Sequence, residues 1–203
     1  MTLHVSRGVA VHTLFDRHTL PDGFRCANDF ISPEEERELV AIIGGLDFHD
    51  VRMRGVVARR RVIQYGWKYS FESFRMTEGP PLPAFLVPAR DRSARFAGVP
   101  AQQLSEALIT EYSPGATIGW HRDAPGFGIV LGISLLSGCR FRFRHGQTRA
   151  WQRTEIVLPP RSVYLLSGPA RTEWQHSIPA VSTLRYSITF RTLKRPAVET
   201  QAV

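Results

Sequence analysis

The second half of the chain consists of short apolar runs separated by Gly, Pro and Ser. After residue 104 these runs are ALITEYSPG, TIGWH, GIVLGISLLSG, CRFRFRHG, WQRTEIVLPP, RSVYLLSG and LRYSITFRTL. Runs of this length, rich in β-branched and aromatic residues, are typical of an antiparallel β sandwich or barrel. In RFRFR the alternation is strict, so we expect the two phenylalanines on one side of a strand and the arginines on the other: Phe141 and Phe143 against Arg140, Arg142 and Arg144.

Helical periodicity is confined to the first half of the chain. The segment FISPEEERELVAIIGGL (30–46) predicts a helix, because Ser32 can cap it, Pro33 suits its first position and Glu35 completes a capping box. A second, short helix is expected near 82–97, after a Pro-rich loop. The pattern therefore predicts a mainly β protein with N-terminal helical support, an α+β fold, in one domain.

Length and composition change this picture little. A chain of 203 residues with 43% hydrophobic content can bury the core of one large domain. No apolar run approaches the roughly 18 residues of a membrane helix, and the N-terminus lacks the apolar region of a signal peptide. The two cysteines lie far apart, in no disulfide or zinc pattern. We expect a cytoplasmic protein with no membrane partner.

The charge is more informative. The net charge of +8 comes almost wholly from arginine, and the basic residues gather in three segments: 51–75, 89–95 and 139–153. Aromatic residues are interleaved in the first and third segments. This pattern favours an anionic partner such as nucleic acid, with a merely solvated surface as the alternative.

Candidate metal ligands lie in IGWHRDAPGFG (118–128). His121 and Asp123 are two positions apart, so in an extended chain their side chains point the same way. An H-x-D triplet alone does not separate a ligand pair from chance neighbours. His176, 55 residues downstream, is a third candidate, although a lone histidine is more often an ordinary core or surface residue. Two imidazoles and one carboxylate on one face of a metal is the arrangement of non-heme Fe(II) oxygenases.

Two arginines in the last β-rich run point to an anionic cosubstrate. Arg185 and Arg191 are six apart in LRYSITFR, so both can lie on one face of a strand with Ser187 between them. Inward-facing arginines are costly without an anionic partner, and a dicarboxylate beside iron would supply one. The alternative is an outward-facing strand with two solvated arginines.

These elements occur together in one order: Y-x-P-G at 112–115, H-x-D at 121–123, a distal His in SVYLLSGPARTEWQHSI and two arginines in RYSITFR. In this ordered combination the chain resembles the AlkB family of Fe(II)- and 2-oxoglutarate-dependent dioxygenases, over roughly residues 23–194. The resemblance implies a double-stranded β-helix, a jelly roll whose barrel mouth holds the iron. It also implies Fe(II), 2-oxoglutarate and O₂ as cofactor and cosubstrates.

The resemblance assigns roles by position. The iron ligands would be His121, Asp123 and His176. Arg185 would hold the distal carboxylate of 2-oxoglutarate, with Arg191 also lining that end of the site. Further cosubstrate contacts would be made by Tyr112, Ser187 and Thr110. This chain departs from the repair members at two places, since Thr110 stands where they often carry Asn and Pro125 where they carry an acidic residue.

The substrate region implied by the resemblance is a lid formed by the first basic segment, 51–75. Aromatic side chains that could stack on an extruded base are Tyr65, Trp67 and Tyr69, and arginines that could contact phosphates are Arg59, Arg60 and Arg61. The alternative is a β hairpin with one buried aromatic face. The segments RRRVIQYGWKY and PPLP are similar to members related to the tRNA-modifying branch.

The expected organisation is a single domain in four segments: an N-terminal extension packing on the core (1–24), helical support and lid (25–103), the jelly-roll core (104–194) and a tail (195–203). The implied activity is oxidative demethylation of N-alkylated bases in DNA or RNA, with release of succinate, CO₂ and formaldehyde. The same chemistry on a tRNA modification, a protein or another non-repair substrate is the alternative, and a non-catalytic nucleic-acid-binding jelly roll is a remote one. The sequence leaves the lesion, the strand type and the oligomeric state open.

Overall fold

The fold is seen in a computed structural model that describes residues 20–53, 56–69, 76–147 and 150–194. The expected tail (195–203) and most of the expected N-terminal extension (1–19) lie outside the described residues. In the part of the chain that is described, no helix is long and apolar enough to cross a membrane.

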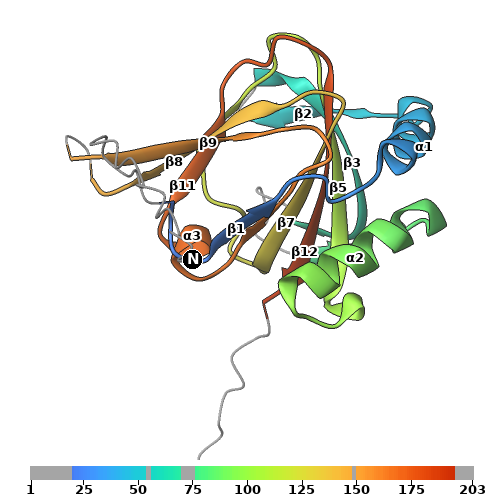
Figure 1. Ribbon diagram of the computed structural model, residues 1–203, viewed down its shortest axis with the longest axis horizontal. Helices are drawn as coiled ribbons and strands as arrows, with labels where there is room; N and C mark the ends of the chain where they lie inside the picture. Colours follow the sequence, from blue (N-terminus) through green and yellow to red (C-terminus); the bar gives the residue numbers. More distant parts are fainter. Residues whose placement is uncertain (1–19, 54–55, 70–75, 148–149, 195–203) are drawn as a thin grey trace, which may run out of the picture.

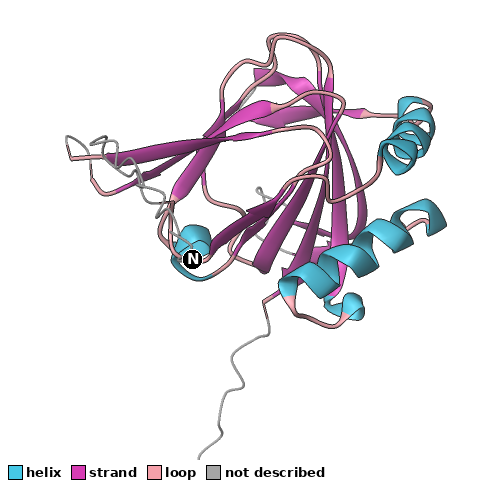
Figure 2. Ribbon diagram, viewed as in Figure 1, coloured by secondary structure: helices cyan, strands magenta, loops and turns pink. Residues whose placement is uncertain are grey.

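Two antiparallel sheets form the body of the protein (Figures 1 and 2). The larger sheet has the order β1 (Phe24–Ala27), β10 (Val163–Leu166), β7 (Phe127–Leu135), β12 (Arg185–Leu193), β5 (Leu104–Tyr112), β3 (Val56–Tyr69) and β2 (His49–Met53), with β4 (Met76–Glu78) paired to β3. The smaller sheet has the order β6 (Ile118–His121), β11 (Gln175–Ile178), β8 (Cys139–His145) and β9 (Gln152–Leu158). The predicted mainly β, jelly-roll fold with helical support is confirmed.

The predicted helices are present and cover one face of the larger sheet (Figure 1). They are α1 (Pro33–Gly44) and α2 (Val87–Ala97), the latter preceded by a 3₁₀ turn, η1 (Ala84–Leu86), and followed by η2 (Ala101–Gln103). A short helix that the sequence did not predict, α3 (Gly168–Thr172), follows β10. The capping box of α1 forms as expected, because Glu35 N donates to Ser32 Oγ at 3.1 Å and Ser32 N donates to Glu35 Oε2 at 2.9 Å.

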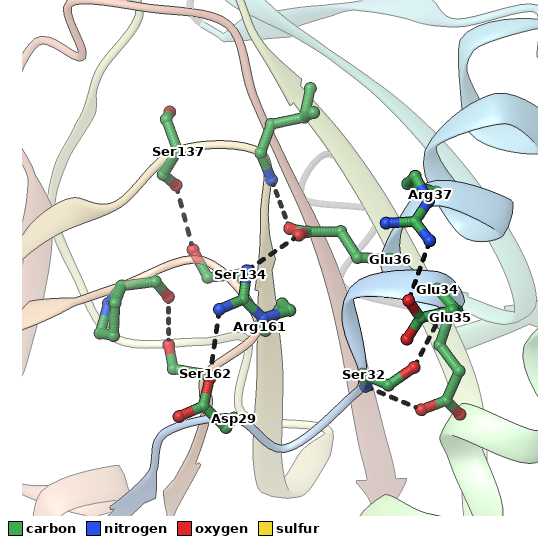
Figure 3. Close-up of polar contacts among 12 residues, drawn as sticks. Asp29, Ser32, Glu34, Glu35, Glu36, Arg37, Ser134, Ser137, Arg161 and Ser162 are labelled. Carbon is green, nitrogen blue, oxygen red and sulfur yellow. Dashed lines mark hydrogen bonds and ion pairs between the residues drawn. The ribbon is translucent and has the colours of Figure 1, made fainter.

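Ion pairs attach α1 to its surroundings (Figure 3). Arg161 donates to Glu36 at 3.4 Å and to Asp29 at 3.2 Å, and Glu36 also accepts the Leu136 N–H at 2.9 Å. On the other side of α1, Arg92 of α2 forms a 2.6 Å ion pair with Glu35. The helical support is therefore joined to the β core by charge as well as by apolar packing.

Strand alternation divides the interior into two cores. On β12, Tyr186, Ile188 and Phe190 face the helices and pack in the cluster that includes Leu39 and Leu86. Ile188 and Phe190 are fully buried, and burial of such side chains contributes about 1.5–3 kcal/mol each. The alternate residues of β12 face the space between the two sheets, so one strand contributes to the core and to the site.

Candidate metal centre and cosubstrate pocket

A tight turn delivers the chain from the larger sheet to the metal-binding strand. Strand β5 ends at Tyr112, and Ala116 N then donates to Ser113 O at 2.8 Å. Gly115 adopts a φ of 83°, and a Cβ there would lie 2.7 Å from Arg59 Nη1. Glycine is thus favoured at this point of the Y-x-P-G motif by its backbone conformation, whereas the exposed end of Arg59 could shift to make room for a Cβ.

A β-bulge turns His121 into the space between the sheets. His121 pairs with His176 and Ile118 pairs with Ile178, so three steps on β6 oppose two on β11. Ile118 and His121 consequently both line one pocket, whereas Trp120 contacts arginines on the outer face of the smaller sheet.

The three predicted iron ligands meet in this pocket. The ligand atoms of His121, Asp123 and His176 all lie within 4.8 Å of one another, and the two imidazole rings are 4.2 Å apart between centroids. His176 Nε2 lies 3.6 Å from Asp123 Oδ2. His121 Nδ1 lies 2.9 Å from Gly119 O, so with its proton on Nδ1 this histidine has a free lone pair on Nε2.

The protonation states suit metal binding. Burial, together with the neighbouring His121, lowers the pKa of His176 to about 3, which keeps its imidazole neutral. Burial opposes the charge of Asp123, but Arg191, His176 and His121 hold its pKa well below the usual range. The site therefore offers a neutral imidazole at His176 and a carboxylate at Asp123, beside the imidazole of His121, and these are the ligand types of a facial iron triad.

Arg191 binds one oxygen of Asp123 and leaves the other without a hydrogen bond. Its Nε and Nη2 lie 3.0 Å and 2.9 Å from Asp123 Oδ1, and its Nη1 donates to both oxygens of Glu106 at 2.9 Å. Asp123 Oδ2 is buried and has no hydrogen-bond partner among the described residues. An unpaired buried carboxylate oxygen beside two imidazoles fits a metal ion.

Glu106 was not among the residues that the sequence identified. It is fully buried on β5, and its side chain also hydrogen-bonds Gln64. Burial, only partly offset by Arg191, raises its pKa to about 7. Nothing in the local sequence LSEALIT (104–110) separates Glu106 from a solvated glutamate, because its partner Arg191 is 85 residues away.

Arg185 provides a second unpaired group at the other end of the pocket. Its side chain is 1% exposed, its Nε donates to Ser134 Oγ at 3.1 Å and its Cζ lies 4.8 Å from the centre of the Tyr112 ring. Its Nη1 is buried without a partner among the described residues. A buried guanidinium with a free N–H fits a carboxylate such as the distal one of 2-oxoglutarate.

The pocket wall includes the other predicted cosubstrate residues. Thr110, Tyr112 and Ser187 are all buried and line the pocket between Arg185 and the metal ligands. Tyr164 lines it too, although the sequence did not indicate this. Tyr164 pairs with Gly132 across β7 and β10, and a Cβ on Gly132 would lie 2.3 Å from the tyrosine ring. Only the register reveals that this glycine makes space for Tyr164.

A second unpredicted residue, Arg171, holds the loop that follows Asp123. Its guanidinium is buried and donates to three backbone carbonyls, at 2.8 Å in each case: those of Ala124, Phe127 and Gly128. A buried arginine that closes a loop in this way restricts the backbone on the C-terminal side of a metal ligand.

The residues expected in the lid are divided between the two faces of β3. Arg61 and Tyr65 lie on the helix-covered face, where Arg61 pairs with Glu111 at 2.8 Å and Tyr65 packs on the helix-side core. Both side chains lie on the face of β3 that is turned from the pocket, and their contact with substrate stays a prediction. The packing of Tyr65 on the helix-side core accords with the alternative of a buried aromatic face.

The remaining lid residues have different positions. Arg60 pairs with Tyr112 in the register of β3 and β5, on the pocket side, and its Nη1 lies 3.4 Å from Thr117 O. Arg59 is exposed beside Gly115. Trp67 is half-buried and pairs with Glu78 of β4. The side chain of Tyr69 lies outside the described part of the structure.

Comparison with known proteins gives the family of this chain. The sequence matches the 2OG-Fe(II) oxygenase superfamily over residues 23–191. The human DNA oxidative demethylase ALKBH2 is 30% identical over 203 residues, covering 86% of this chain and 76% of that protein. The Arabidopsis thaliana "Alkylated DNA repair protein ALKBH8 homolog" is 27% identical over 191 residues, covering 82% of this chain and 54% of that relative, so the chain spans about half its length.

Among solved structures, OsALKBH1 superposes with a TM-score of 0.62 at 15% identity, covering 86% of this chain and 98% of that one. This likeness shows the shared fold. A jelly roll with two histidines, one aspartate and a buried arginine in one pocket defines a 2-oxoglutarate-dependent Fe(II) oxygenase. The chain belongs to the 2OG-Fe(II) oxygenase superfamily and, within it, to the AlkB family. It is a dioxygenase that uses Fe(II), 2-oxoglutarate and O₂.

Proposed function

We propose that this protein is an oxidative demethylase that removes N-alkyl groups from nucleic-acid bases, with release of succinate, CO₂ and formaldehyde. The observation that supports it most is the pair of unpaired buried atoms, Asp123 Oδ2 and Arg185 Nη1, in one pocket of an AlkB-family chain. The names of its relatives, a DNA oxidative demethylase and an alkylated DNA repair protein, favour alkylated bases as the substrate class.

The residues divide the work of such a reaction. His121, Asp123 and His176 would hold the iron, and Arg185, with Tyr112 and Ser187 along the wall, would orient 2-oxoglutarate. Bound iron and 2-oxoglutarate supply the oxidising power for hydroxylation of a C–H bond, and a hydroxylated N-methyl group leaves as formaldehyde. The chain itself would orient the substrate and keep water away from the reacting carbon. The apolar side chains of Phe141, Ile118 and Ile178, which line the same pocket, would serve the second purpose.

The test uses purified protein with Fe(II), ascorbate and 2-oxoglutarate. Short single-stranded DNA and RNA oligonucleotides carrying 1-methyladenine or 3-methylcytosine are added, and product mass and succinate are measured. We expect loss of one methyl mass, coupled to succinate and absent in Asp123→Ala. Methyl groups that persist while succinate forms would overturn demethylation of these bases but leave the oxygenase chemistry in place.

The same experiment addresses the alternative substrate class. Total tRNA, digested to nucleosides after the reaction, would show a new oxidised nucleoside if the pocket acts on a tRNA modification. The tRNA reaction is included because Pro125 stands two positions after the metal-binding Asp, where the repair members carry an acidic residue. A carboxylate that could recognise the base is therefore absent from that position.

A further inference from the structure

We propose that the outer face of the smaller sheet binds the sugar–phosphate backbone of a polynucleotide, through arginines held against tryptophan rings. This inference rests on the proposed function for its substrate class. We call this surface the arginine–tryptophan face and define it by Trp120, Arg142, Arg144, Trp151 and Arg153. Four of its five residues lie in the third basic segment of the sequence (139–153), whereas the expected phosphate contacts were assigned to the first.

Strand geometry places these side chains on the outer face. On β8, Phe141 and Phe143 are buried between the sheets, as the alternation predicted, and Arg142 and Arg144 project to the other side. Arg153 on β9 is exposed and pairs in register with Arg144. The bulge that turns His121 inward leaves Trp120 on this outer face, one residue from a metal ligand.

Neutral groups hold the two arginines of β8. Arg142 Nε donates to Ser177 Oγ at 3.1 Å, and Arg144 Nε donates to Gln175 Oε1 at 2.7 Å. Their guanidinium carbons lie 5.0 Å and 4.7 Å from the centre of the Trp120 ring, and Arg144 also lies 4.2 Å from that of Trp151. Stacking on rings orients a guanidinium without neutralising it, so each can still bind phosphate.

The contrast with other arginines supports a ligand role. Arg140, on the same strand, forms a 2.7 Å ion pair with Glu155, and Arg61 of the first basic segment forms one with Glu111. In the described ranges, no ion pair involves Arg142, Arg144 or Arg153. Three arginines without an ion pair among the described residues are therefore neighbours on this face, and two of them lie against Trp120.

Their arrangement is unfavourable in the free protein. Arg144 and Arg153 are directly opposite each other on neighbouring strands, where like charges destabilise a sheet. Partial desolvation and then the charge of Arg153 lower the pKa of the Arg144 guanidinium. An anion placed between them would relieve this repulsion. The backbone of a polynucleotide carries phosphates in a row and can place one beside each arginine, whereas a single small anion cannot.

The location suits a substrate that also enters the pocket. Strands β8, β9 and β11 lie on the opposite side of the molecule from α1 and α2, so neither of these helices covers this face (Figure 1). Because Trp120 and His121 are consecutive, a polynucleotide crossing the face passes beside the strand that holds the metal ligand. The face would then retain the backbone while one base occupies the pocket.

The test measures binding of unmodified, fluorescently labelled single-stranded DNA, RNA and duplex DNA by anisotropy, without iron or 2-oxoglutarate. We expect Arg142→Gln with Arg144→Gln to weaken single-strand binding at least tenfold. Two lost phosphate contacts should also reduce the slope of log K against log salt by about 1.4, since each contributes about 0.7. The matched control, Arg37→Gln with Arg95→Gln, removes the same charge from the helical side and should change neither value appreciably.

A second variant separates binding from folding. Arg153→Gln removes the repulsion with Arg144, so we expect its melting temperature to equal or exceed that of the wild type while single-strand affinity falls about threefold. A residue with only a structural role would not combine these effects. Equal losses in the double variant and its control, or no loss in either, would overturn the proposed face.

The outcome is independent of the proposed demethylation. If the wild-type protein removes methyl groups but shows no salt-sensitive binding of unmodified strands, only the proposed role of the arginine–tryptophan face is refuted. Binding that depends on Arg142 and Arg144, in a protein that leaves methyl groups in place, would refute the demethylase and keep the face. Equal binding of acidic polypeptide, such as polyglutamate, would show that the face is not selective for polynucleotide and would also refute the proposal.

Discussion

The two ends of β12 carry arginines on the same face of the same strand, with opposite surroundings. At one end, Arg191 is paired with both Glu106 and Asp123, and its pKa is raised because these carboxylates outweigh the cost of burial. At the other end, Arg185 contacts a hydroxyl and an aromatic ring and keeps one N–H unpaired. The paired arginine shapes the metal site, and the unpaired one is prepared for a ligand that the chain does not supply.

The largest effect is expected from breaking the paired end. Arg191→Gln leaves Glu106 and Asp123 buried without their cation, which should destabilise the fold by about 3–5 kcal/mol. Chemical denaturation of the metal-free protein measures this change. The double variant Arg191→Gln with Glu106→Gln should recover part of it, and a double variant no more stable than the single one would argue against the ionic network.

The unpaired end should respond in binding rather than in folding. Arg185→Gln removes a buried charge that has no carboxylate partner in the described structure, so stability should be unchanged or higher. Affinity for 2-oxoglutarate, measured by calorimetry with Mn(II) in place of Fe(II), should fall at least about 100-fold, or about 2.8 kcal/mol. Retained affinity would show that another group holds the distal carboxylate.

Arg171 offers an intermediate test, because it acts on the metal site only through the loop after Asp123. Arg171→Gln cannot reach the carbonyls of Ala124, Phe127 and Gly128 together, so we expect about tenfold weaker Mn(II) binding. Arg171→Lys retains the charge but loses the several N–H donors of the guanidinium, so it should restore little of the Mn(II) affinity. Full recovery by lysine would mean that charge, and not loop geometry, is the contribution of Arg171.

The smallest effect concerns pH. The pKa of Glu106 is raised to about 7 in the fold, so the native state binds a proton more readily than the unfolded chain. The stability from this group is full below its unfolded pKa and is lost as pH rises through about 7. Between pH 6 and pH 8 the metal-free protein should lose about 1 kcal/mol relative to Glu106→Gln, measured by urea denaturation. Parallel pH profiles for the two proteins would contradict this.

The first basic segment shows where sequence reasoning stopped. The aromatic and basic residues of 51–75 predicted substrate contacts, but the direction of each side chain depends on which face of β3 meets the helices. Tyr65 packs on the helix-side core and Arg61 lies on the same face of β3, whereas Arg60 faces the pocket side, and no local pattern distinguishes these positions. A shift of one residue in the register would exchange them.

What the sequence determined by itself depends on local or strongly patterned chemistry. The capping box at Ser32 and Glu35, the alternation around Phe141 and Phe143, and the ordered set of His121, Asp123, His176 and Arg185 could all be identified without coordinates. Short-range hydrogen bonding and period-two burial act within a few residues, and the ligand set follows a resemblance in motif order.

Only the tertiary structure decided which charges are paired. Glu106 meets Arg191 across 85 positions, Tyr164 packs against Gly132, and Arg144 lies opposite Arg153, neither of which forms an ion pair among the described residues. These relations depend on strand register and on the approach of two sheets, which bring together residues distant in the chain. The energy of a buried charge is set by its partner in space, so the sequence shows which residues can ionise and the fold decides what each one binds.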